Sequence, residues 1–244
     1  MLGVALPAAQ IYFFFHAHLV QYKYRTALCV SGLVTLIAFY HYLRIFNSWT
    51  EAYEFMPVTE ESTEYICKAS GKPFNDAYRY MDWLLTVPLL LIELILVMDL
   101  DKATEAALSI KLGSAAALMI LLGYPGEITL DHGTRWMFWF LAMLPFLYVV
   151  YTLLIGLKEA IASEGNPKVA SMLTQVCYAT VISWCTYPVV YLFPMIGFGG
   201  PQAVIAIQLG YCVSDIISKC GVGFLIYNIT ITKSAALNNS LLGK

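Results

Sequence analysis

Seven long apolar segments constrain the fold of this chain more than any other feature of its sequence. Each is close to the roughly 20 residues that a helix needs to cross a bilayer. We place the segments at residues 3–22, 26–46, 75–98, 106–126, 135–158, 168–193 and 202–231. Of the 244 residues, 59% are hydrophobic and 12% are charged, whereas soluble domains carry about 25% charged residues. We therefore predict an all-α membrane protein, in which residues 1–244 form a single seven-helix bundle.

The connections between these segments are short turns, except for residues 47–74, which are rich in Glu and Thr. The sequence leaves open whether this connection folds into a small hairpin or a cap. Lys and Arg are more frequent on the side of the C-terminus, with eight such residues there and five on the opposite side. Because positive charge accumulates in cytoplasmic loops, we expect an external N-terminus and a cytoplasmic C-terminus.

Composition also excludes some classes of function. The formal net charge is −2 and no basic stripe is present, so nucleic acid is not an expected partner. The six cysteines follow no metal-binding or disulfide pattern, and we predict no metal site. Most of them lie in apolar segments, where a free cysteine behaves as a small hydrophobic residue.

The third apolar segment carries charged residues that a bilayer would not tolerate without a function. Arg79, Asp82 and Glu93 lie within residues 78–93, and intramembrane ionisable residues are candidates for an ion or proton path. Asp82, Thr86 and Glu93 share one helical face, and the two carboxyl groups are separated by roughly 16 Å along the axis. This spacing is that expected of a proton relay.

The last apolar segment contains a lysine, Lys219, four residues after Asp215 on the same helical face. Such a lysine is paired with an acid, neutral or chemically modified, and a desolvated amine is suited to forming a Schiff base with a carbonyl compound. An ion pair with Asp215 is the simpler alternative. Aromatic side chains that could enclose a long, flat, apolar ligand occur in the neighbouring segments, although they could equally be ordinary packing: Trp83, Trp139, Trp184, Tyr187 and Tyr191.

Three motifs together resemble those of the microbial (type I) rhodopsins. They are Arg79-x-x-Asp82-Trp83-x-x-Thr86, Trp184-Cys-Thr-Tyr187-Pro188 and Asp215-x-x-x-Lys219. Residues 74–89 are most similar to the proteorhodopsin and xanthorhodopsin branch, and the resemblance extends over essentially the whole chain.

This resemblance implies a chromophore, all-trans retinal, attached to Lys219 as a protonated Schiff base. The retinal would lie among the side chains of Trp83, Trp139, Trp184, Tyr187, Pro188 and Tyr191. Leu90 matches the position that tunes colour in this branch, where leucine accompanies green absorption. The fifth segment has only bulky residues at 136–140, where antenna-carrying xanthorhodopsins have a glycine, so no carotenoid antenna is expected.

The resemblance also implies roles for the charged residues. Asp82 would be the primary counterion and proton acceptor, Asp215 the second counterion, and Glu93 the cytoplasmic proton donor. Arg79 would offset the excess of carboxylates around one cation. Chloride pumps replace the acid at position 82 and sodium pumps carry Asn-Asp-Gln in the equivalent places, and neither pattern occurs here.

Three polar residues have supporting roles in the same scheme. His41 matches a histidine that hydrogen-bonds the counterion aspartate, with a structural histidine as the alternative. Tyr42 is expected to hydrogen-bond Asp215. Thr86 bonds either to Asp82 one turn below or to the backbone of its own helix.

We therefore expect a light-driven outward proton pump, not an enzyme, in the plasma membrane or an endomembrane. Its expected partners are protons, the lipid bilayer and further copies of itself in a homo-oligomer. A slow photosensor that signals to a partner protein is the alternative, which Glu93 disfavours. The turn at 194–201 holds no carboxyl group, so a paired-glutamate release complex is absent from it. Glu127, at the end of the fourth segment, either makes a subunit or helix-end contact or is solvated.

Overall fold

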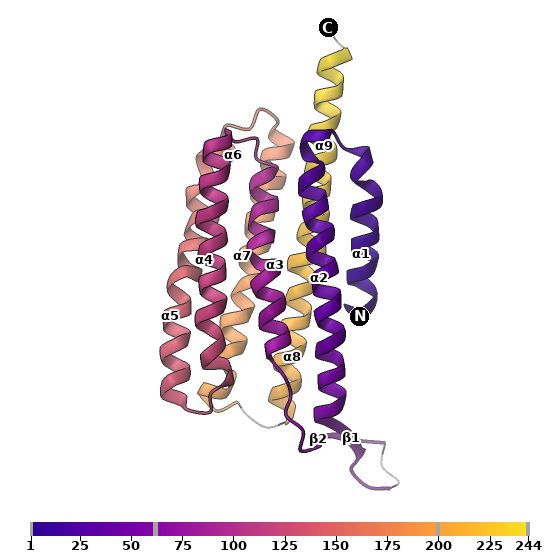
Figure 1. Ribbon diagram of the computed structural model, residues 1–244, viewed down its shortest axis with the longest axis vertical. Helices are drawn as coiled ribbons and strands as arrows, with labels where there is room; N and C mark the ends of the chain where they lie inside the picture. The colour runs from indigo at the N-terminus through magenta and orange to yellow at the C-terminus, as the bar shows by residue number, and fades with distance from the viewer. Residues whose placement is uncertain (1, 61–62, 199–200, 243–244) are drawn as a thin grey trace.

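The computed structural model describes residues 2–60, 63–198 and 201–242, and these form a bundle of long helices with one small hairpin (Figure 1). The first four long helices are α1 (Leu2–His16), α2 (Tyr22–Ala52), α3 (Ala77–Leu96) and α4 (Lys102–Ile128). The fifth is α5 (His132–Tyr151), continued by a π-helical turn (Thr152–Gly156) and α6 (Lys158–Ala162). The sixth is α7 (Pro167–Leu192), followed by a 3₁₀ turn (Phe193–Ile196). The last comprises α8 (Pro201–Asp215), a π-helical turn (Ile216–Gly221) and α9 (Val222–Leu242).

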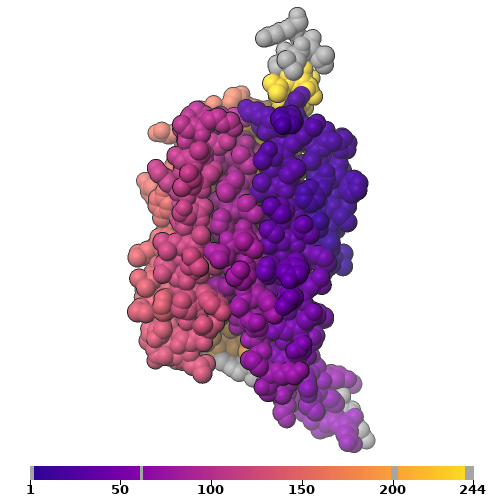
Figure 2. Space-filling model, in the orientation of Figure 1, coloured from indigo at the N-terminus to yellow at the C-terminus, as the bar shows by residue number. Residues whose placement is uncertain are grey.

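The predicted seven-helix bundle is confirmed. Five helices are long and apolar enough to cross a membrane by length and composition, and the short α1 and the charge-bearing α3 are not among them. The surface is rich in apolar side chains along the helices, as at Ile110, Leu144 and Ile182, which are each more than 60% exposed. Figure 2 shows the elongated outer surface of the bundle, with the hairpin projecting from one end. Such a surface suits a lipid environment, because exposed apolar patches of this extent are rare on soluble monomers.

The connection whose fold the sequence left open is a two-stranded antiparallel hairpin. Strands β1 (Tyr53–Pro57) and β2 (Tyr65–Ala69) pair with Tyr53 opposite Ala69. Helix α2 extends to Ala52, beyond the predicted end at residue 46, because its last turns lie outside the apolar stretch that defined the prediction. We call this the hairpin end of the bundle, where α3 begins and α4 ends.

The last helix is not regular, although the apolar pattern predicted one uninterrupted segment at 202–231. The π-helical turn begins directly after Asp215 and contains Lys219. Single π-helical turns are rare and occur mostly at functional sites. The irregularity therefore lies where the sequence places its most unusual charge.

A cluster of charged side chains joins the helices at the opposite end of the bundle. Asp99 follows α3 in a left-handed conformation (φ 56°). Its carboxylate contacts the Nζ atoms of Lys23 at 2.5 Å and Lys233 at 2.9 Å, and it accepts a hydrogen bond of 2.9 Å from the hydroxyl of Tyr24. Lys233 also pairs with Glu164 at 2.6 Å, so the cluster links α2, α9 and the connection before α7.

The charge of Asp99 is expected to contribute pH-dependent stability. Burial alone would raise its pKa, but hydrogen bonds from Lys23, Lys233 and Tyr24 outweigh burial and hold the pKa below its usual range. A carboxyl group with a lowered pKa stabilises the fold above its unfolded pKa of about 3.9, and this contribution is lost as the pH falls through the folded value. We expect Asp99→Asn to cost about 1–2 kcal/mol at neutral pH, and this cost should shrink as the pH falls below about 3.9. Thermal unfolding at several pH values measures the difference.

The exposed residue Glu54 in the hairpin provides the control for this prediction. Glu54→Gln should leave the unfolding midpoint unchanged at every pH. A constant difference between Asp99→Asn and the unsubstituted protein down to pH 2 would contradict the electrostatic explanation.

Candidate functional site

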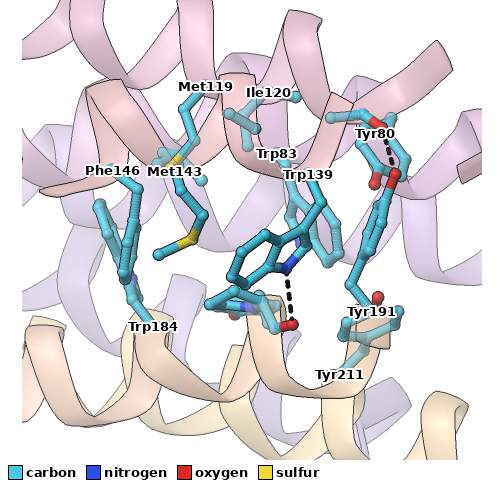
Figure 3. A pocket seen from close by; sticks show the side chains of 15 residues that line it. Tyr80, Trp83, Met119, Ile120, Trp139, Met143, Phe146, Trp184, Tyr191 and Tyr211 are labelled. Atoms are coloured by element: carbon cyan, nitrogen blue, oxygen red, sulfur yellow. Dashed lines mark hydrogen bonds between the residues drawn. The ribbon is translucent and has the colours of Figure 1, made fainter. Parts of the chain in front are cut away.

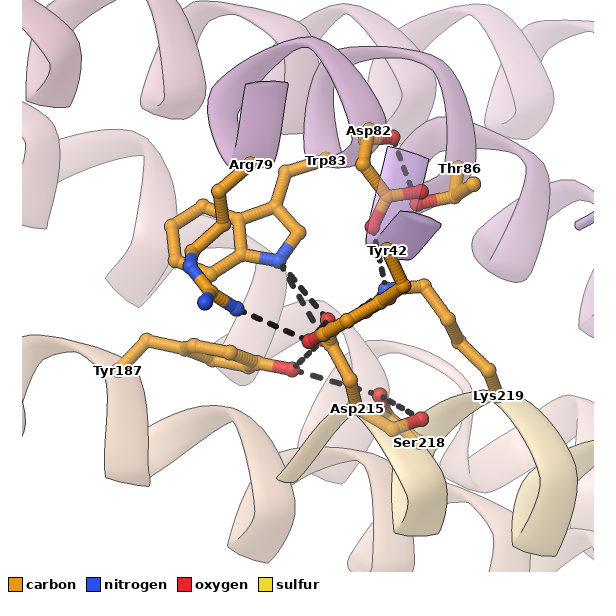
Figure 4. Close-up of polar contacts among 9 residues, drawn as sticks. All are labelled: Tyr42, Arg79, Asp82, Trp83, Thr86, Tyr187, Asp215, Ser218 and Lys219. Carbon is orange, nitrogen blue, oxygen red and sulfur yellow. Dashed lines mark hydrogen bonds and ion pairs between the residues drawn. The ribbon is translucent and has the colours of Figure 1, made fainter. Parts of the chain in front are cut away.

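The centre of the bundle holds a lysine between two carboxylates, all three essentially excluded from solvent. The Nζ atom of Lys219 lies 2.9 Å from Oδ2 of Asp82 and 2.9 Å from Oδ1 of Asp215. Lys219 is 1% exposed, and both aspartates are 0% exposed. Figure 4 shows that Asp82 approaches from α3, and Asp215 and Lys219 from the last helix. Sequence motifs from two distant helices thus meet at one point, as expected.

Asp215 is held by donors at both of its carboxylate oxygens. Tyr42 donates to Oδ2, Tyr187 donates to Oδ1 at 2.5 Å, and the indole Nε1–H of Trp83 lies 3.3 Å from Oδ1. The expected contact between Tyr42 and Asp215 is therefore present. With Lys219, these donors leave little capacity for Asp215 to accept a further hydrogen bond.

Asp82 is less fully satisfied than Asp215. Its Oδ1 atom is buried and has no hydrogen-bond partner among the described residues. Of the two alternatives for Thr86, the structure shows the backbone one, since its hydroxyl donates to the carbonyl oxygen of Asp82 at 2.8 Å. A buried carboxylate oxygen without a donor is costly to maintain and is a natural place for a proton to bind.

The expected hydrogen bond between His41 and Asp82 is not present in the part of the chain that the structure describes. The Nδ1 atom of His41 has no partner, and its ring interacts with the backbone of Tyr78, one turn before Asp82. The histidine is therefore near the start of α3, and the structure favours its alternative, packing within the bundle.

Arg79 lies on the side of Asp82 that faces the hairpin end, and it is 1% exposed. Its Nη1 donates to the hydroxyl of Tyr42 at 2.9 Å and its Nη2 donates to the side-chain oxygen of Gln208. The ring of Tyr211 lies 5.1 Å from the guanidinium carbon. The sequence-based reasoning did not select Gln208 and Tyr211. Gln208 was detectable as a polar residue inside an apolar segment.

Glu93 lies in a separate buried position on α3, about three turns from Asp82. It is 0% exposed, and its Oε2 accepts a 2.7 Å hydrogen bond from the hydroxyl of Ser31 on α2. The Oε1 atom has no partner among the described residues. Ser31 also lies 3.3 Å from the carbonyl oxygen of Ala27, so it can donate there when Glu93 itself carries a proton. The sequence-based reasoning missed Ser31.

An apolar cavity lies beside the charged centre, since Trp83 and Tyr187 both line it and donate to Asp215. Figure 3 shows the side chains that line this cavity. All six aromatic and proline residues expected in the binding site line it, and the Nε1–H of one of them, Trp139, donates to the carbonyl of Pro188 at 3.1 Å. The lining residues are Tyr80, Trp83, Val87, Met119, Ile120, Gly123, Trp139, Ala142, Met143, Phe146, Trp184, Tyr187, Pro188, Tyr191 and Tyr211. Leu90 is buried but does not line the cavity, so its expected effect on colour is not supported by direct contact.

Glu127 makes one of the contacts that the sequence left open. Its side chain is 12% exposed and lies 3.7 Å from Nη2 of Arg135, across the turn between α4 and α5. The helix-end contact is therefore present, and the carboxyl group is not freely solvated. The turn at 194–201 lies partly outside the described residues, at 199–200.

A family model described as bacteriorhodopsin-like protein matches residues 1–233. The chain belongs to this family. It is 30% identical over 236 residues to the green-light absorbing proteorhodopsin of Gamma-proteobacterium EBAC31A08, covering 96% of this chain and 86% of the relative. Together with the helices described above, this membership makes the chain a multi-pass integral membrane protein.

Solved structures place this rhodopsin in the expected branch. The crystal structure of xanthorhodopsin, described as a light-driven ion pump with dual chromophore, has a TM-score of 0.88 and 40% identity, covering 97% of this chain and 92% of the other. A thermophilic rhodopsin has the same TM-score and identity, covering 96% and 91%. The predicted kinship with the proteorhodopsin and xanthorhodopsin branch is therefore confirmed.

Proposed function

We propose that this rhodopsin is a light-driven outward proton pump with all-trans retinal bound to Lys219. The observation that carries the proposal is the position of Lys219 Nζ, which lies 2.9 Å from the carboxylates of both Asp82 and Asp215. A third buried acid, Glu93, lies farther along α3. A protein that only bound retinal would need the cavity and the lysine alone. The two buried acids on α3, Asp82 and Glu93, are what a proton path requires in addition.

The residues present fit retinal. The cavity is almost entirely apolar, as a polyene chain requires, and it adjoins the only lysine that the described structure buries at the bundle centre. The side chains of Trp83, Trp139, Trp184, Tyr187, Pro188 and Tyr191 would hold the ligand. When bound, retinal supplies light absorption and a protonated Schiff base at Nζ of Lys219, whose positive charge the two aspartates neutralise.

Asp82 is the better proton acceptor of the two aspartates. Asp215 already accepts hydrogen bonds from Tyr42, Tyr187 and Trp83, whereas Oδ1 of Asp82 has no donor. A proton leaving Nζ of Lys219 therefore finds a free acceptor site on Asp82. Asp215 stays charged because its donors stabilise the carboxylate, and Arg79 compensates that charge.

Glu93 would return a proton to Nζ of Lys219 from the end of the bundle opposite the hairpin. Its apolar, fully buried position favours the protonated carboxyl, since an unpaired charge there would be poorly solvated. The Ser31 hydroxyl donates to Oε2, and the Oε1 atom, which has no partner among the described residues, is free to carry the proton. The excess of Lys and Arg at the end opposite the hairpin supports a cytoplasmic location for that end.

Illumination of cells that contain the retinal-bound protein tests the proposal. In unbuffered medium, light should acidify the exterior, and a protonophore should abolish the signal. Light-driven alkalinisation, or no pH change at neutral pH, would overturn the proposed direction or the proposed ion.

Glu93 also separates a pump from the rival photosensor, because a sensor gains from slow return of the proton. We expect Glu93→Gln to slow reprotonation of Lys219 by on the order of 100-fold, as loss of a positioned proton donor does. Flash photolysis measures this rate, and azide added as a small external acid should restore part of it. A cycle that already lasts many seconds and does not change in Glu93→Gln would favour the sensor.

We propose further that no carotenoid antenna is present and that the protein forms a homo-oligomer. Residues 136–140 are all bulky, and among them Trp139 lines the cavity and is fixed by its hydrogen bond to the carbonyl of Pro188. Carotenoid bands in the excitation spectrum of the pigment would contradict the first proposal. A monomeric mass in native membranes or nanodiscs would contradict the second.

A further inference from the structure

Three ionisable side chains meet at the hairpin end of the bundle, and the proposed proton path does not use them. Glu127 on α4 and Arg135 on α5 form the ion pair of 3.7 Å, and Arg135 is 9% exposed. Asp76, the residue before α3, is partly buried and interacts electrostatically with both of them. We call Asp76, Glu127 and Arg135 the outer cluster.

The outer cluster is connected to the buried lysine by hydrogen bonds. The Gln208 side chain lies within hydrogen-bonding reach of Asp76 and accepts from Nη2 of Arg79. The Nη1 of the same guanidinium donates to Tyr42, which donates to Asp215 (Figure 4). A change of charge at Asp215, beside Lys219, therefore reaches Asp76 through the hydroxyl of Tyr42, the guanidinium of Arg79 and the amide of Gln208.

Charge balance indicates that the outer cluster holds a proton. The inner cations, Lys219 and Arg79, are matched by two carboxylates, Asp82 and Asp215. In the outer cluster, one cation faces two carboxyl groups. A surplus negative charge in a region shielded from water is costly, so one of the two carboxyl groups is expected to be neutral.

The surroundings of the outer cluster supply no further cation to remove this surplus. In the described part of the chain, the other titratable groups that interact with Asp76 or Glu127 are Tyr53 on β1, Arg79 and Tyr80 on α3, Tyr191 on α7 and Tyr211 on α8. Arg79 is already engaged by Tyr42 and Gln208. The Oε2 atom of Glu127 faces Nη2 of Arg135 only at the ion-pair distance of 3.7 Å, and neither this atom nor the Nε of Arg135 makes a hydrogen bond to the described residues, which leaves room for an exchangeable proton or a water.

We propose that Asp76 and Glu127 share one proton and form the site from which the pumped proton leaves the protein. This inference rests on the proposed function. One proton moves from Lys219 to Asp82, the outer cluster gives one proton to external water, and the proton on Asp82 later refills the cluster. One proton thus leaves for each one moved, without the pair of glutamates that the 194–201 turn lacks.

Time-resolved measurements on the retinal-bound protein in nanodiscs test this proposal. Infrared difference spectroscopy reports protonation of Asp82, and a pH-sensitive dye reports arrival of the proton in the medium. In Asp76→Asn and in Glu127→Gln, we expect the delay between protonation of Asp82 and protonation of the dye to be at least tenfold longer than in the unsubstituted protein. Both variants should also lose an infrared carbonyl band that belongs to the shared proton. Asp76→Glu should restore the band and most of the rate.

Control measurements separate this proposal from the pump itself. The exposed hairpin variant Glu54→Gln should behave as the unsubstituted protein. Wild-type timing within twofold and an unchanged carbonyl region in both Asp76→Asn and Glu127→Gln would overturn the proposal. Absence of any light-driven proton release from the unsubstituted protein would overturn the proposed function instead. If one variant fails to form pigment, the other decides, because Asp76 precedes α3 and Glu127 lies on α4.

Discussion

Lys219→Ala is expected to abolish visible absorption completely when the protein is reconstituted with retinal. Lys219 is the amine at the bundle centre, adjoining the apolar cavity, and a Schiff base cannot form without it. The substitution also leaves Asp82 and Asp215 facing each other without a cation, so uptake of a proton by one of them is expected. An absorption spectrum after incubation with retinal measures the loss.

Two variants control the interpretation of this loss. Lys219→Arg keeps the positive charge between the aspartates but cannot form the bond, so the fold should survive while the absorption band is lost. Lys233→Ala removes another buried lysine of the same helix, at the opposite end of the bundle, and should keep the band. A visible band in Lys219→Ala, at a wavelength other than that of free retinal, would contradict the assignment of Lys219.

The fold and the centre of the site could be predicted from the sequence because each has a strong local signal. Apolar segments of membrane-spanning length indicate the helices, and a charge within such a segment indicates function. Asp82, Asp215 and Lys219 were selected in this way, and the structure brings them together at 2.9 Å. The hairpin could not be predicted, since its strands are short and largely exposed and no buried face marks them.

The hydrogen-bond partners of these residues depend on tertiary structure and were predicted less well. Tyr42 met Asp215 as expected, whereas His41 did not bond to Asp82. Ser31 and Gln208 were overlooked, because one small or neutral polar residue in an apolar helix often bonds to its own backbone. Only the packing of α2 and α8 against α3 shows that these two residues contact Glu93 and Arg79.

The burial of the outer-cluster residues could not be predicted from the sequence, for a different reason. Asp76 and Glu127 lie at helix ends, where a carboxyl group is normally solvated, and nothing local distinguishes them from exposed acids. Their burial results from convergence of α3, α4 and α5 at the hairpin end, where Arg135 interacts with both of them. Convergence of this kind is not visible in a helical pattern taken one segment at a time.

Asp82→Asn is expected to stop proton pumping while keeping the pigment, whereas Asp215→Asn is expected to damage the site more broadly. Both aspartates lie 2.9 Å from Lys219, so distance does not separate them. Their other contacts do: among the described residues the carboxylate of Asp82 has one partner, Lys219, whereas Asp215 also binds Tyr42, Tyr187 and Trp83. Losing Asp82 therefore removes the acceptor and leaves the surrounding hydrogen bonds intact.

The expected size of the Asp82→Asn effect follows from the loss of a positioned proton acceptor. Deprotonation at Lys219 should slow by on the order of 100-fold or more, and external acidification should fall to the level of cells without retinal. The absorption band should move to longer wavelength, because less negative charge remains beside the positive Schiff base. Asp82→Glu keeps an acidic acceptor and should retain part of the pumping. If Asp82→Asn pumped at the original rate while Asp215→Asn formed normal pigment and did not pump, the roles of the two aspartates would have to be exchanged.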